Sequence, residues 1–376
     1  MLHIGFDAKR LLFNRSGLGN YSRAIVRALA LHTSETKLTL LSPKSKSDWA
    51  KSIAIAGIDP ESVCENIELV SPSFAPFWWR SKGMGSTANQ SGVDVFHGLS
   101  NEIPFDLPRR IRKVCTIHDL IFIDHPRNYP WLDRNIYRRK VEFALRNCDA
   151  IIATSVFTKD SILFHYPETQ VPIHVVYQPV HPLFNSSESK KTSSEKPYFI
   201  YHSGFNKRKN HLRLLEAFKS VKQSISQNLM LVGIKGDTYD EVNTWVTRNE
   251  MTERVILKTD VETPELVKLL SCSDGFIYPS LMEGFGIPLA EAAVMGLNAA
   301  VSDIPVFNEL SNGGFITFDP IKVESIAHAL VSLASLDETA KNQQRTARSK
   351  VVELTNSQTI ANQLMAIYKD QHTDAS

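Results

Sequence analysis

Two glutamates, Glu283 and Glu291, lie eight residues apart around a turn that contains Gly284 and Gly286. Glycines let the backbone approach a ligand closely, and the start of a helix offers unpaired N–H groups to anionic oxygen. A carboxylate beside such a turn can accept hydrogen bonds from the hydroxyl groups of a sugar. This combination suits the binding of a phosphorylated sugar, although the glutamates of an ordinary strand–turn–helix can also be solvated or capping.

A buried strand and a short helix must position these residues. The apolar run Gly275–Pro279 predicts the strand, and the helix should begin at Pro288 and stop at Gly296. With that start, Glu291 belongs to the first turn of the helix. There the macrodipole favours the ionised carboxylate by roughly 0.3–1 kcal/mol.

A basic turn, Lys207, Arg208 and Lys209, follows a predicted strand of the same domain. The same edge of the sheet would collect this turn and Glu283, because ligand sites form at the carboxyl ends of parallel strands. Cations at this edge could neutralise a diphosphate leaving group, although surface charge alone is the competing interpretation. The chain has no D-x-D pair to hold Mg²⁺, so we expect no metal to be required.

Two further predicted strands, Val93–His97 and Lys113–His118, each end in a histidine. Both histidines would therefore point at one sheet edge. A structural role is favoured for His97. A functional role is favoured for His118, because Asp119 could orient its ring.

The turn of residues 16–23, with Gly17 and Gly19, follows the first predicted strand and opens a helix. It is not a phosphate-binding P-loop, because no Gly-Lys-Ser/Thr follows at the required spacing. The turn is either a tight connection or a place where the backbone approaches a ligand.

The 376 residues are enough for two or three domains. Short apolar strands alternate with amphipathic helices on both sides of the polar segment 185–196, which predicts a linker between two doubly wound α/β domains. Residues 74–90 are expected to form a loop that carries Trp78 and Trp79, and Arg134–Cys148 a helix. The final helix has an apolar stripe that must pack on something, formed by Ile360, Leu364, Ile367 and Tyr368.

The charge balance of 42 basic and 40 acidic residues argues against a general nucleic-acid binder. Basic residues cluster at 109–113 and 134–140, where a solvated face competes with contact to an anionic membrane or a phosphorylated acceptor. The four cysteines are scattered and suggest neither a zinc site nor a disulfide framework. Without a recognisable signal peptide or membrane span, we expect a cytoplasmic protein whose membrane contact, if any, is peripheral.

The motif from Glu283 to Glu291 resembles the E-x7-E signature of retaining glycosyltransferases of family 4, in particular bacterial mannosyltransferases. Further motifs match in the family's order over nearly the whole chain: Gly17-Leu-Gly-Asn-Tyr, His97-Gly-Leu-Ser, Thr116-Ile-His-Asp119, Arg208-Lys-Asn210 and Ser302-Asp-Ile-Pro305. The resemblance implies the GT-B fold, two Rossmann-like domains facing a central cleft. It implies an acceptor-binding domain at 1–184, a nucleotide-sugar-binding domain at 197–356, and a C-terminal helix at 357–376 that crosses back to the first domain.

The resemblance also implies residue roles. Glu291 would bind the nucleotide ribose, and Glu283 with the backbone of 284–286, including Phe285, would hold the donor sugar. Lys209, helped by Arg208, would stabilise the diphosphate, and Gly17 and Gly19 would approach it. His118 would lie near the reacting carbon, so His118, Lys209 and Glu283 are the predicted catalytic residues, and His97 and Asp119 are assigned to the acceptor. Many members have an arginine where this chain has Ser203 or Gly204, so either Arg208 replaces that charge or the diphosphate clamp is weaker.

The expected reaction is front-face transfer of a hexose with retention, in which the leaving phosphate accepts the acceptor's proton. GDP-mannose is the first choice of donor, with UDP-sugars as the alternative, and the acceptor would be a saccharide or lipid-linked saccharide of a bacterial surface polysaccharide such as O-antigen or capsule. A paired-carboxylate hydrolase is less suitable, because the cationic turn favours phosphate over water as the group handled. An epimerase or phosphorylase of the same architecture, or a non-catalytic sugar-binding protein, stays open.

Overall fold

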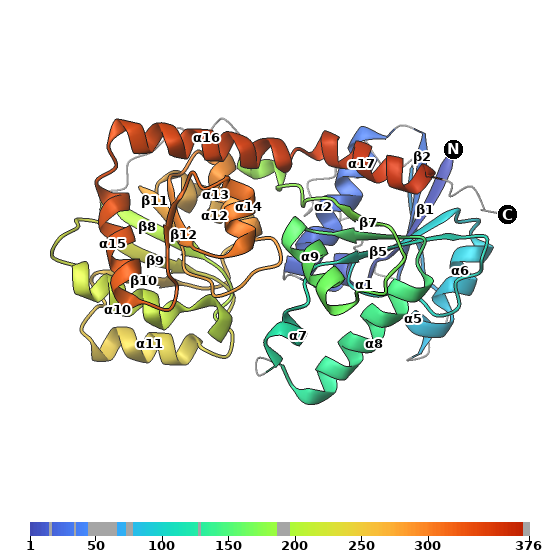
Figure 1. Cartoon of the computed structure of the whole chain (residues 1–376), viewed down its shortest axis with the longest axis horizontal. Helices are drawn as coiled ribbons and strands as arrows, with labels where there is room; N and C mark the ends of the chain where they lie inside the picture. Colours follow the sequence, from blue (N-terminus) through green and yellow to red (C-terminus); the bar gives the residue numbers. More distant parts are fainter. Residues whose placement is uncertain are drawn as a thin grey trace. The chain divides into compact units, whose positions relative to one another are not determined.

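The computed structural model describes residues 1–14, 17–33, 35–43, 66–72, 78–126, 129–185 and 196–370. The chain divides into two compact units (Figure 1). Unit 1 comprises Met1–His181 and Thr355–Ser376, and unit 2 comprises Pro182–Leu354. Most of the predicted linker, residues 186–195, lies outside the described residues.

Unit 1 contains a parallel sheet of seven strands in the order β3-β2-β1-β4-β5-β6-β7. The register pairs Phe6 of β1 with Leu40 of β2 on one side and with His97 of β4 on the other. The strands are β1 (Leu2–Asp7), β2 (Thr36–Leu41), β3 (Ile67–Val70), β4 (Val95–Gly98), β5 (Arg112–Ile117), β6 (Ala150–Ala153) and β7 (Ile173–Val175).

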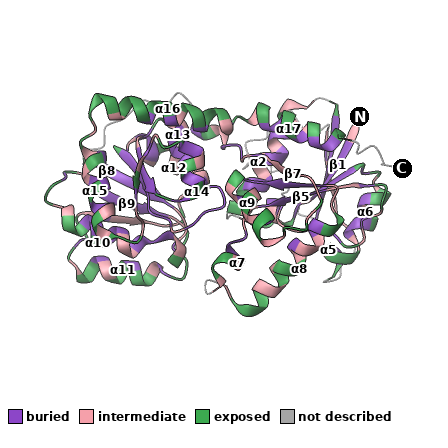
Figure 2. Ribbon diagram, in the orientation of Figure 1, coloured by how far each residue is buried: buried purple, intermediate pink, exposed green. Residues whose placement is uncertain are grey.

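Two apolar clusters, one centred on β1, β2 and α2 and the other on β5 and α8, cover the sheet of unit 1. Central strands such as β4 and β6 are buried throughout, as expected for a parallel sheet covered by helices. Figure 2 shows the buried colour on strands such as β5 and the exposed colour on helices such as α8. The helices are α1 (Lys9–Phe13), α2 (Gly17–His32), α5 (Trp79–Lys82), α6 (Met84–Gln90), α7 (Ile121–Asp124), α8 (Trp131–Asn147), α9 (Val156–His165) and α17 (Ser357–Lys369).

The C-terminal helix α17 packs on α2 of unit 1 and confirms that the last helix returns to the first domain. Its apolar stripe, Ile360, Leu364, Ile367 and Tyr368, joins the cluster around β1 and β2. Burial of these side chains explains why the helix is held here, since a helix with one apolar stripe must cover that stripe.

Unit 2 contains a parallel sheet of six strands in the order β10-β9-β8-β11-β12-β13. These strands are β8 (Tyr198–His202), β9 (Asn228–Val232), β10 (Val255–Lys258), β11 (Gly275–Tyr278), β12 (Ala299–Ser302) and β13 (Ile316–Phe318). The helices are η2 (Pro182–Asn185), η3 (Lys207–Lys209), α10 (His211–Val221), α11 (Tyr239–Arg248), α12 (Thr263–Ser271), α13 (Ile287–Val294), α14 (Pro305–Ser311), α15 (Val323–Ala334) and α16 (Glu338–Leu354). The prediction of two doubly wound α/β domains is confirmed.

Each sheet has one position where the strand order reverses direction. In unit 1 this position lies between β1 and β4, and in unit 2 it lies between β8 and β11. In open parallel sheets, ligands bind in the crevice outside the carboxyl ends of the strands at such a point. The loops after these four strands are therefore the places to look for functional residues.

The predicted loop over 74–90 is wrong where the structure describes it, because α5 and α6 occupy most of that segment. Two glycines allow these short helices to pack closely. A Cβ at Gly83 would lie 2.7 Å from the ring of Trp79, and a Cβ at Gly85 would lie 2.5 Å from the backbone of Asp106. Trp79 is buried and Trp78 is exposed, so one tryptophan belongs to the core and the other to the surface.

No helix among the described residues combines the length and the apolar character that crossing a bilayer requires.

Candidate active site

The loop after β11 directs the carboxylate of Glu283 toward the turn after β8. Arg208 Nη1 donates to Glu283 Oε2 over 2.7 Å, and Lys209 Nζ donates to Oε1. Oε1 also accepts from Ser280 Oγ at 2.6 Å and from the hydroxyl of Tyr278 at 3.0 Å. The loops meet because β8 and β11 are neighbouring strands at the point where the strand order reverses.

Glu283 is ionised in this arrangement. Burial is the largest single effect and works against the charge, but the attraction of Arg208 and Lys209 outweighs burial and lowers the pKa of Glu283 to about 2. Two cations face one carboxylate, so the three side chains carry a net charge of about +1 at neutral pH. This cluster can hold an anion such as a diphosphate while its carboxylate accepts sugar hydroxyls.

Gly286 sets the angle at which the chain enters α13. Its backbone φ is 94°, a value that residues with a side chain rarely adopt. A Cβ at this position would also lie 2.6 Å from the ring of Phe307. Phe285 just before it is buried. Gly296, with φ of 79°, follows the last turn of α13 as predicted from its position.

The predicted start of this helix is wrong by one residue, with a consequence for Glu291. The helix begins at Ile287, so Glu291 is its fifth residue and lies beyond the first turn. The macrodipole effect falls off within that turn, so the dipole is not what holds this carboxylate. Glu291 is only 8% exposed, and its Oε2 lies 3.1 Å from His202 Nε2, although the two atoms do not have hydrogen-bond geometry.

His202 is a site residue that sequence reasoning missed. It is the last residue of β8 and only 9% exposed, and so stands at the reversal point of unit 2 beside Glu291. The signal was available, because the same strand-ending position drew attention to two histidines of unit 1. The hydroxyls of Tyr278 and Ser280, which position Glu283, were missed because a pattern does not reveal hydrogen bonds.

In unit 1, His118 follows β5 and is held in one orientation. Its Nε2 donates to the carbonyl of Leu99 over 2.8 Å, and its backbone N–H donates to Asn101 Oδ1 over 2.9 Å. Burial is the main reason that the pKa of His118 falls to about 4, so the ring is neutral at physiological pH. With Nε2 protonated, Nδ1 is the atom that can accept a proton or a hydrogen bond.

The contacts to Leu99 and Asn101 hold the ring and backbone of His118, and the role of Asp119 in orienting the ring stays a prediction. Asp119 Oδ1 accepts from the backbone N–H of Ile121 over 3.1 Å, at the start of α7. An aspartate side chain commonly accepts from the backbone N–H two residues further on in this way, which forms an Asx-turn.

His97 does not have the position expected of an acceptor-binding residue. Its side chain is fully buried, with Nδ1 2.7 Å from the hydroxyl of Tyr368 and Nε2 2.8 Å from Thr116 Oγ1. Burial lowers the pKa of His97 to about 3, so it stays neutral. The histidine links the central sheet to α17, which is a structural role.

The glycines of the first turn differ from each other. A Cβ at Gly19 would lie 2.0 Å from the carbonyl oxygen of Asn14, so this glycine allows the start of α2 to pack against the preceding loop. Among the described residues, none would lie within 4 Å of a Cβ at Gly17. Packing therefore explains Gly19, and the approach of Gly17 to a ligand stays a prediction.

The structure therefore brings Arg208, Lys209 and Glu283 together in unit 2, with Glu291 and His202 at the same sheet edge. In unit 1, His118 is a half-buried residue whose Nε2 donates to Leu99, which leaves Nδ1 as the ring nitrogen that can accept.

The two halves of the chain match two family models. Residues 15–182 match the model described as Glycosyltransferase Family 4, and residues 184–350 match the model described as Glycosyl transferases group 1. Together the matches span almost the whole chain. The chain belongs to the family 4 glycosyltransferases, and it is a glycosyltransferase with the GT-B fold.

Individual relatives agree with this class. The chain is 24% identical to the O-antigen chain mannosyltransferase RfbU of Salmonella typhimurium over 86% of this chain and 89% of that protein. It is 29% identical to O-antigen chain mannosyltransferase B of Escherichia coli over 64% and 65% of the two chains. Among solved structures, Anabaena HepE in complex with UDP and glucose is similar with a TM-score of 0.73, at 14% identity over 98% and 99% of the chains.

Proposed function

We propose that this glycosyltransferase transfers a mannosyl group from GDP-mannose to a saccharide or lipid-linked saccharide acceptor during O-antigen assembly. The observation that carries the proposal is the carboxylate of Glu283 held by Arg208 and Lys209 at the reversal point of the unit 2 sheet. The names of the two curated relatives supply mannose as the sugar and O-antigen as the product.

In the proposed reaction, Glu291 binds the ribose hydroxyls and Glu283 binds hydroxyls of the donor sugar. Arg208 and Lys209 stabilise the negative charge that develops on the diphosphate as the bond from C1 to the phosphate oxygen breaks. The acceptor oxygen bonds to C1 on the same face, and its proton passes to the departing phosphate oxygen. Retention of configuration follows from attack on that face.

Arg208 provides the positive charge that many family members obtain from an arginine at the position of Ser203 or Gly204. Its guanidinium reaches the same carboxylate as Lys209, so both cations are available to one phosphate group. With two cations, we propose that transfer needs no divalent metal. Full activity in the presence of EDTA supports this, and loss of activity that Mg²⁺ restores contradicts it.

The binding of the donor is tested by thermal unfolding in the presence of GDP-mannose, UDP-glucose and ADP-glucose. A ligand that binds only the folded protein stabilises it by RT ln(1 + [L]/Kd), about 2.7 kcal/mol at one hundred times Kd. GDP-mannose should give the largest shift in Tm. A larger shift in Tm with UDP-glucose would show that UDP-glucose and not GDP-mannose is the preferred donor. That result would agree with the UDP and glucose bound in the HepE structure.

The alternatives are distinguished by the products. A transferase releases GDP only when a saccharide acceptor is present, and NMR of the product should show the anomeric configuration of the donor. Product from the donor alone identifies an epimerase, and product that requires inorganic phosphate identifies a phosphorylase. Binding without turnover over a broad acceptor panel identifies a non-catalytic protein.

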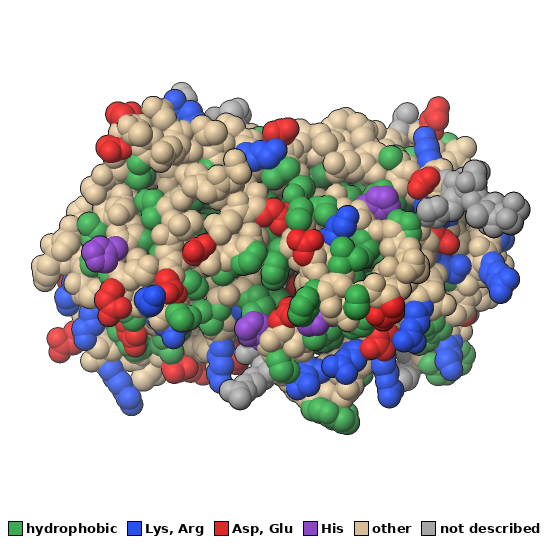
Figure 3. All heavy atoms as spheres, in the orientation of Figure 1, with side chains coloured by type: hydrophobic (Ala, Val, Ile, Leu, Met, Phe, Trp, Pro, Cys, Tyr) green, Lys and Arg blue, Asp and Glu red, His purple; other side chains and the backbone are tan. Residues whose placement is uncertain are grey.

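We also propose that the exposed face of α8 in unit 1 lies against an anionic membrane. This α8 face consists of Trp131, Leu132 and Ile136, which are 68%, 66% and 48% exposed, together with the exposed Arg138 and Arg139. Figure 3 shows Lys and Arg side chains gathered over this part of unit 1, with hydrophobic side chains among them. Apolar residues beside basic ones suit the boundary of a negatively charged bilayer, where a lipid-linked acceptor would be anchored.

A further inference from the structure

Glu291, the carboxylate that we assign to the ribose, has few polar contacts within the protein. It lies on α13, which packs against β11 and β12, and only 8% of its surface is exposed. Among the described residues, no group donates a hydrogen bond to this carboxylate, and the polar atom beside it is His202 Nε2, 3.1 Å from Oε2. A buried carboxylate without donors is costly, so this arrangement requires an explanation.

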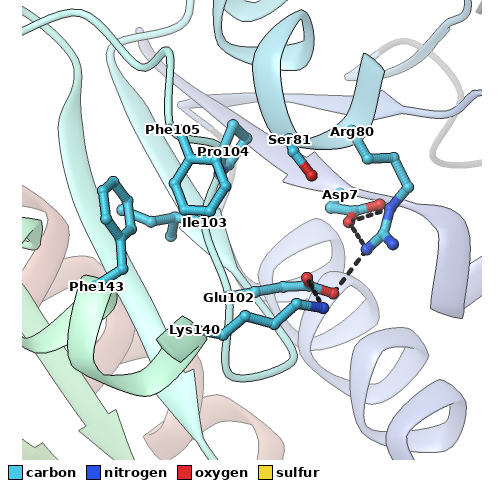
Figure 4. A pocket seen from close by; sticks show the side chains of 9 residues that line it. All are labelled: Asp7, Arg80, Ser81, Glu102, Ile103, Pro104, Phe105, Lys140 and Phe143. Carbon is cyan, nitrogen blue, oxygen red and sulfur yellow. Dashed lines mark hydrogen bonds and ion pairs between the residues drawn. The ribbon is translucent and has the colours of Figure 1, made fainter. Parts of the chain in front are cut away.

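Two other carboxylates at the reversal points of the sheets each have several partners. Figure 4 shows this for Glu102 of unit 1, whose two oxygens pair with Arg80 and Lys140. In unit 2, four side-chain donors hold Glu283. The carboxylate of Glu291 differs from both, because its oxygens are left to accept hydrogen bonds from a ligand.

The ring of His202 is held with Nε2 next to Glu291. His202 is the last residue of β8, where its backbone pairs with Val232 of β9. Its ring packs on Phe276 of β11, with centroids 5.6 Å apart and an angle of 56° between the planes. Nε2 is a buried atom without a hydrogen-bond partner among the described residues, whereas Glu291 keeps some exposure. A ligand can therefore reach the carboxylate but not this nitrogen.

The structural histidine of unit 1 has a different set of contacts. Both ring nitrogens of His97 lie within hydrogen-bond distance of hydroxyl groups, those of Tyr368 and Thr116. A buried polar atom without a partner is unusual in a folded protein and calls for a functional explanation. Nε2 of His202 is such an atom, and Glu291 is the group within its reach.

We infer that His202 is a positioning residue for the nucleotide, whose Nε2–H holds one oxygen of Glu291 so that the carboxylate faces the ribose hydroxyls. Carboxylate oxygens only accept, so the neighbouring ring nitrogen must carry the proton. The two atoms are close enough to bond but are not aligned, and the hydrogen bonds of a site often become aligned only when the substrate is bound. The inference rests on the proposed function, because that function assigns the ribose to Glu291.

A carboxylate oriented in this way selects nucleotides that carry ribose hydroxyls. A nucleotide that lacks these hydroxyls leaves the buried acceptor without a partner and binds more weakly. His202 acts only through Glu291, so its contribution exists for a nucleotide with ribose hydroxyls and is absent for one without them. This dependence separates positioning from a general structural role, which would affect both nucleotides equally.

The test measures Kd by calorimetric titration for GDP and for dideoxy-GDP, the analogue that lacks both ribose hydroxyls. Two variants remove Nε2: His202→Leu, of similar volume, and His202→Asn, which stays polar but is too short to reach Glu291. His202→Gln restores an N–H donor at about the position of Nε2. The control is His211→Leu, which removes another buried histidine of unit 2, one whose ring stacks on Phe205.

The wild type should bind dideoxy-GDP at least about tenfold more weakly than GDP. In His202→Leu and His202→Asn, Kd for GDP should rise about threefold to tenfold, whereas Kd for dideoxy-GDP should stay within about twofold. His202→Gln should bind both nucleotides as the wild type does. Any change in His211→Leu should be the same for the two nucleotides.

Equal weakening of both nucleotides in the variants without Nε2 gives His202 a structural role and overturns the inference, as does an unchanged Kd for GDP. Loss of GDP binding in His202→Gln equal to that in His202→Leu also overturns it, because the N–H donor is then not what acts. Equal binding of GDP and dideoxy-GDP by the wild type removes the ribose from Glu291 and overturns the inference with it.

The proposed donor fails separately if the wild type binds UDP but not GDP. The same comparison with UDP and dideoxy-UDP then decides the inference. Absence of binding of both GDP and UDP by the wild type contradicts the proposed function and the inference together.

Discussion

The guanidinium of Arg208 donates to the carboxylate of Glu283 over 2.7 Å, although 75 positions separate the two residues in the chain. The contact exists because β8 and β11 are adjacent at the reversal point of the unit 2 sheet. It joins the basic turn to the glutamate of the E-x7-E motif. The charge of Glu283 is therefore maintained by the same cations that we assign to the diphosphate.

The stability of the protein should depend on the ionisation of Glu283. Its pKa is about 2 in the folded protein against an ordinary value of 4.5, so its contribution is fully present above pH 4.5 and is lost as the pH falls toward 2. Glu283→Gln breaks a buried ion pair and should cost about 3 kcal/mol at pH 7. Urea unfolding of both proteins from pH 7 to pH 3 should show this difference shrinking as the pH falls. A difference that stays constant would contradict the ion pair.

Replacement of Gly286 by alanine should be more damaging than the same change at Gly296. Both residues have positive φ, but only at Gly286 would the added Cβ meet a ring, at 2.6 Å from Phe307. Backbone strain and overpacking together should cost about 3 kcal/mol at Gly286, whereas strain alone should cost about 1 kcal/mol at Gly296. Chemical denaturation measures both values. Equal losses would show that Phe307 moves aside at no cost.

Removal of the Tyr368 hydroxyl should weaken the attachment of α17. Tyr368→Phe takes away the partner of His97 Nδ1 and leaves a buried polar atom unsatisfied, which costs about 1–3 kcal/mol. The control Tyr137→Phe, a half-buried position on α8, should change the unfolding free energy by less than about 0.5 kcal/mol. A loss no greater than that of the control would remove the structural role given to His97.

The α8 face should bind anionic vesicles in a salt-dependent manner. Cosedimentation should be stronger with phosphatidylglycerol than with phosphatidylcholine and should weaken as salt screens Arg138 and Arg139. Leu132→Glu removes an exposed apolar side chain and adds a negative charge, so bound protein should fall several-fold. Val352→Glu, at an exposed position of α16 in unit 2, serves as the control. Equal sedimentation of the two variants would exclude the α8 face as the surface that binds the membrane.

Features governed by local pattern could be predicted from the sequence. The short apolar runs gave the strands to within about two residues, and the stripe on α17 required a partner that the structure supplies. Glu283, Arg208 and Lys209 were predicted to share a sheet edge because strand ends in parallel sheets converge there. The helices over 79–90 were missed because glycines usually indicate loops, whereas here they allow close packing.

Features that depend on contacts distant in the sequence could not be predicted. His97 and His118 both end a predicted strand. His97 is nevertheless buried against the hydroxyl of Tyr368, whereas His118 has Nδ1 left to accept a hydrogen bond. The ion pairs that join Asp7, Arg80, Glu102 and Lys140 of unit 1 bring together four separate segments, and no motif connects them. Because α13 begins one residue earlier than predicted, Glu291 lies beyond the first turn of the helix. The neighbour of its carboxylate is therefore His202 and not the positive end of the helix dipole.

The most direct test of the donor site is calorimetric titration of GDP-mannose into the wild type, Arg208→Ala and Lys207→Ala. Lys207 belongs to the same turn but is exposed, so it controls for general loss of positive charge. A charge-assisted hydrogen bond contributes about 1.5–3 kcal/mol, so Kd should rise about tenfold to a hundredfold in Arg208→Ala and change less than about threefold in Lys207→Ala. An unchanged Kd in Arg208→Ala would contradict the assignment of this cluster to the donor diphosphate.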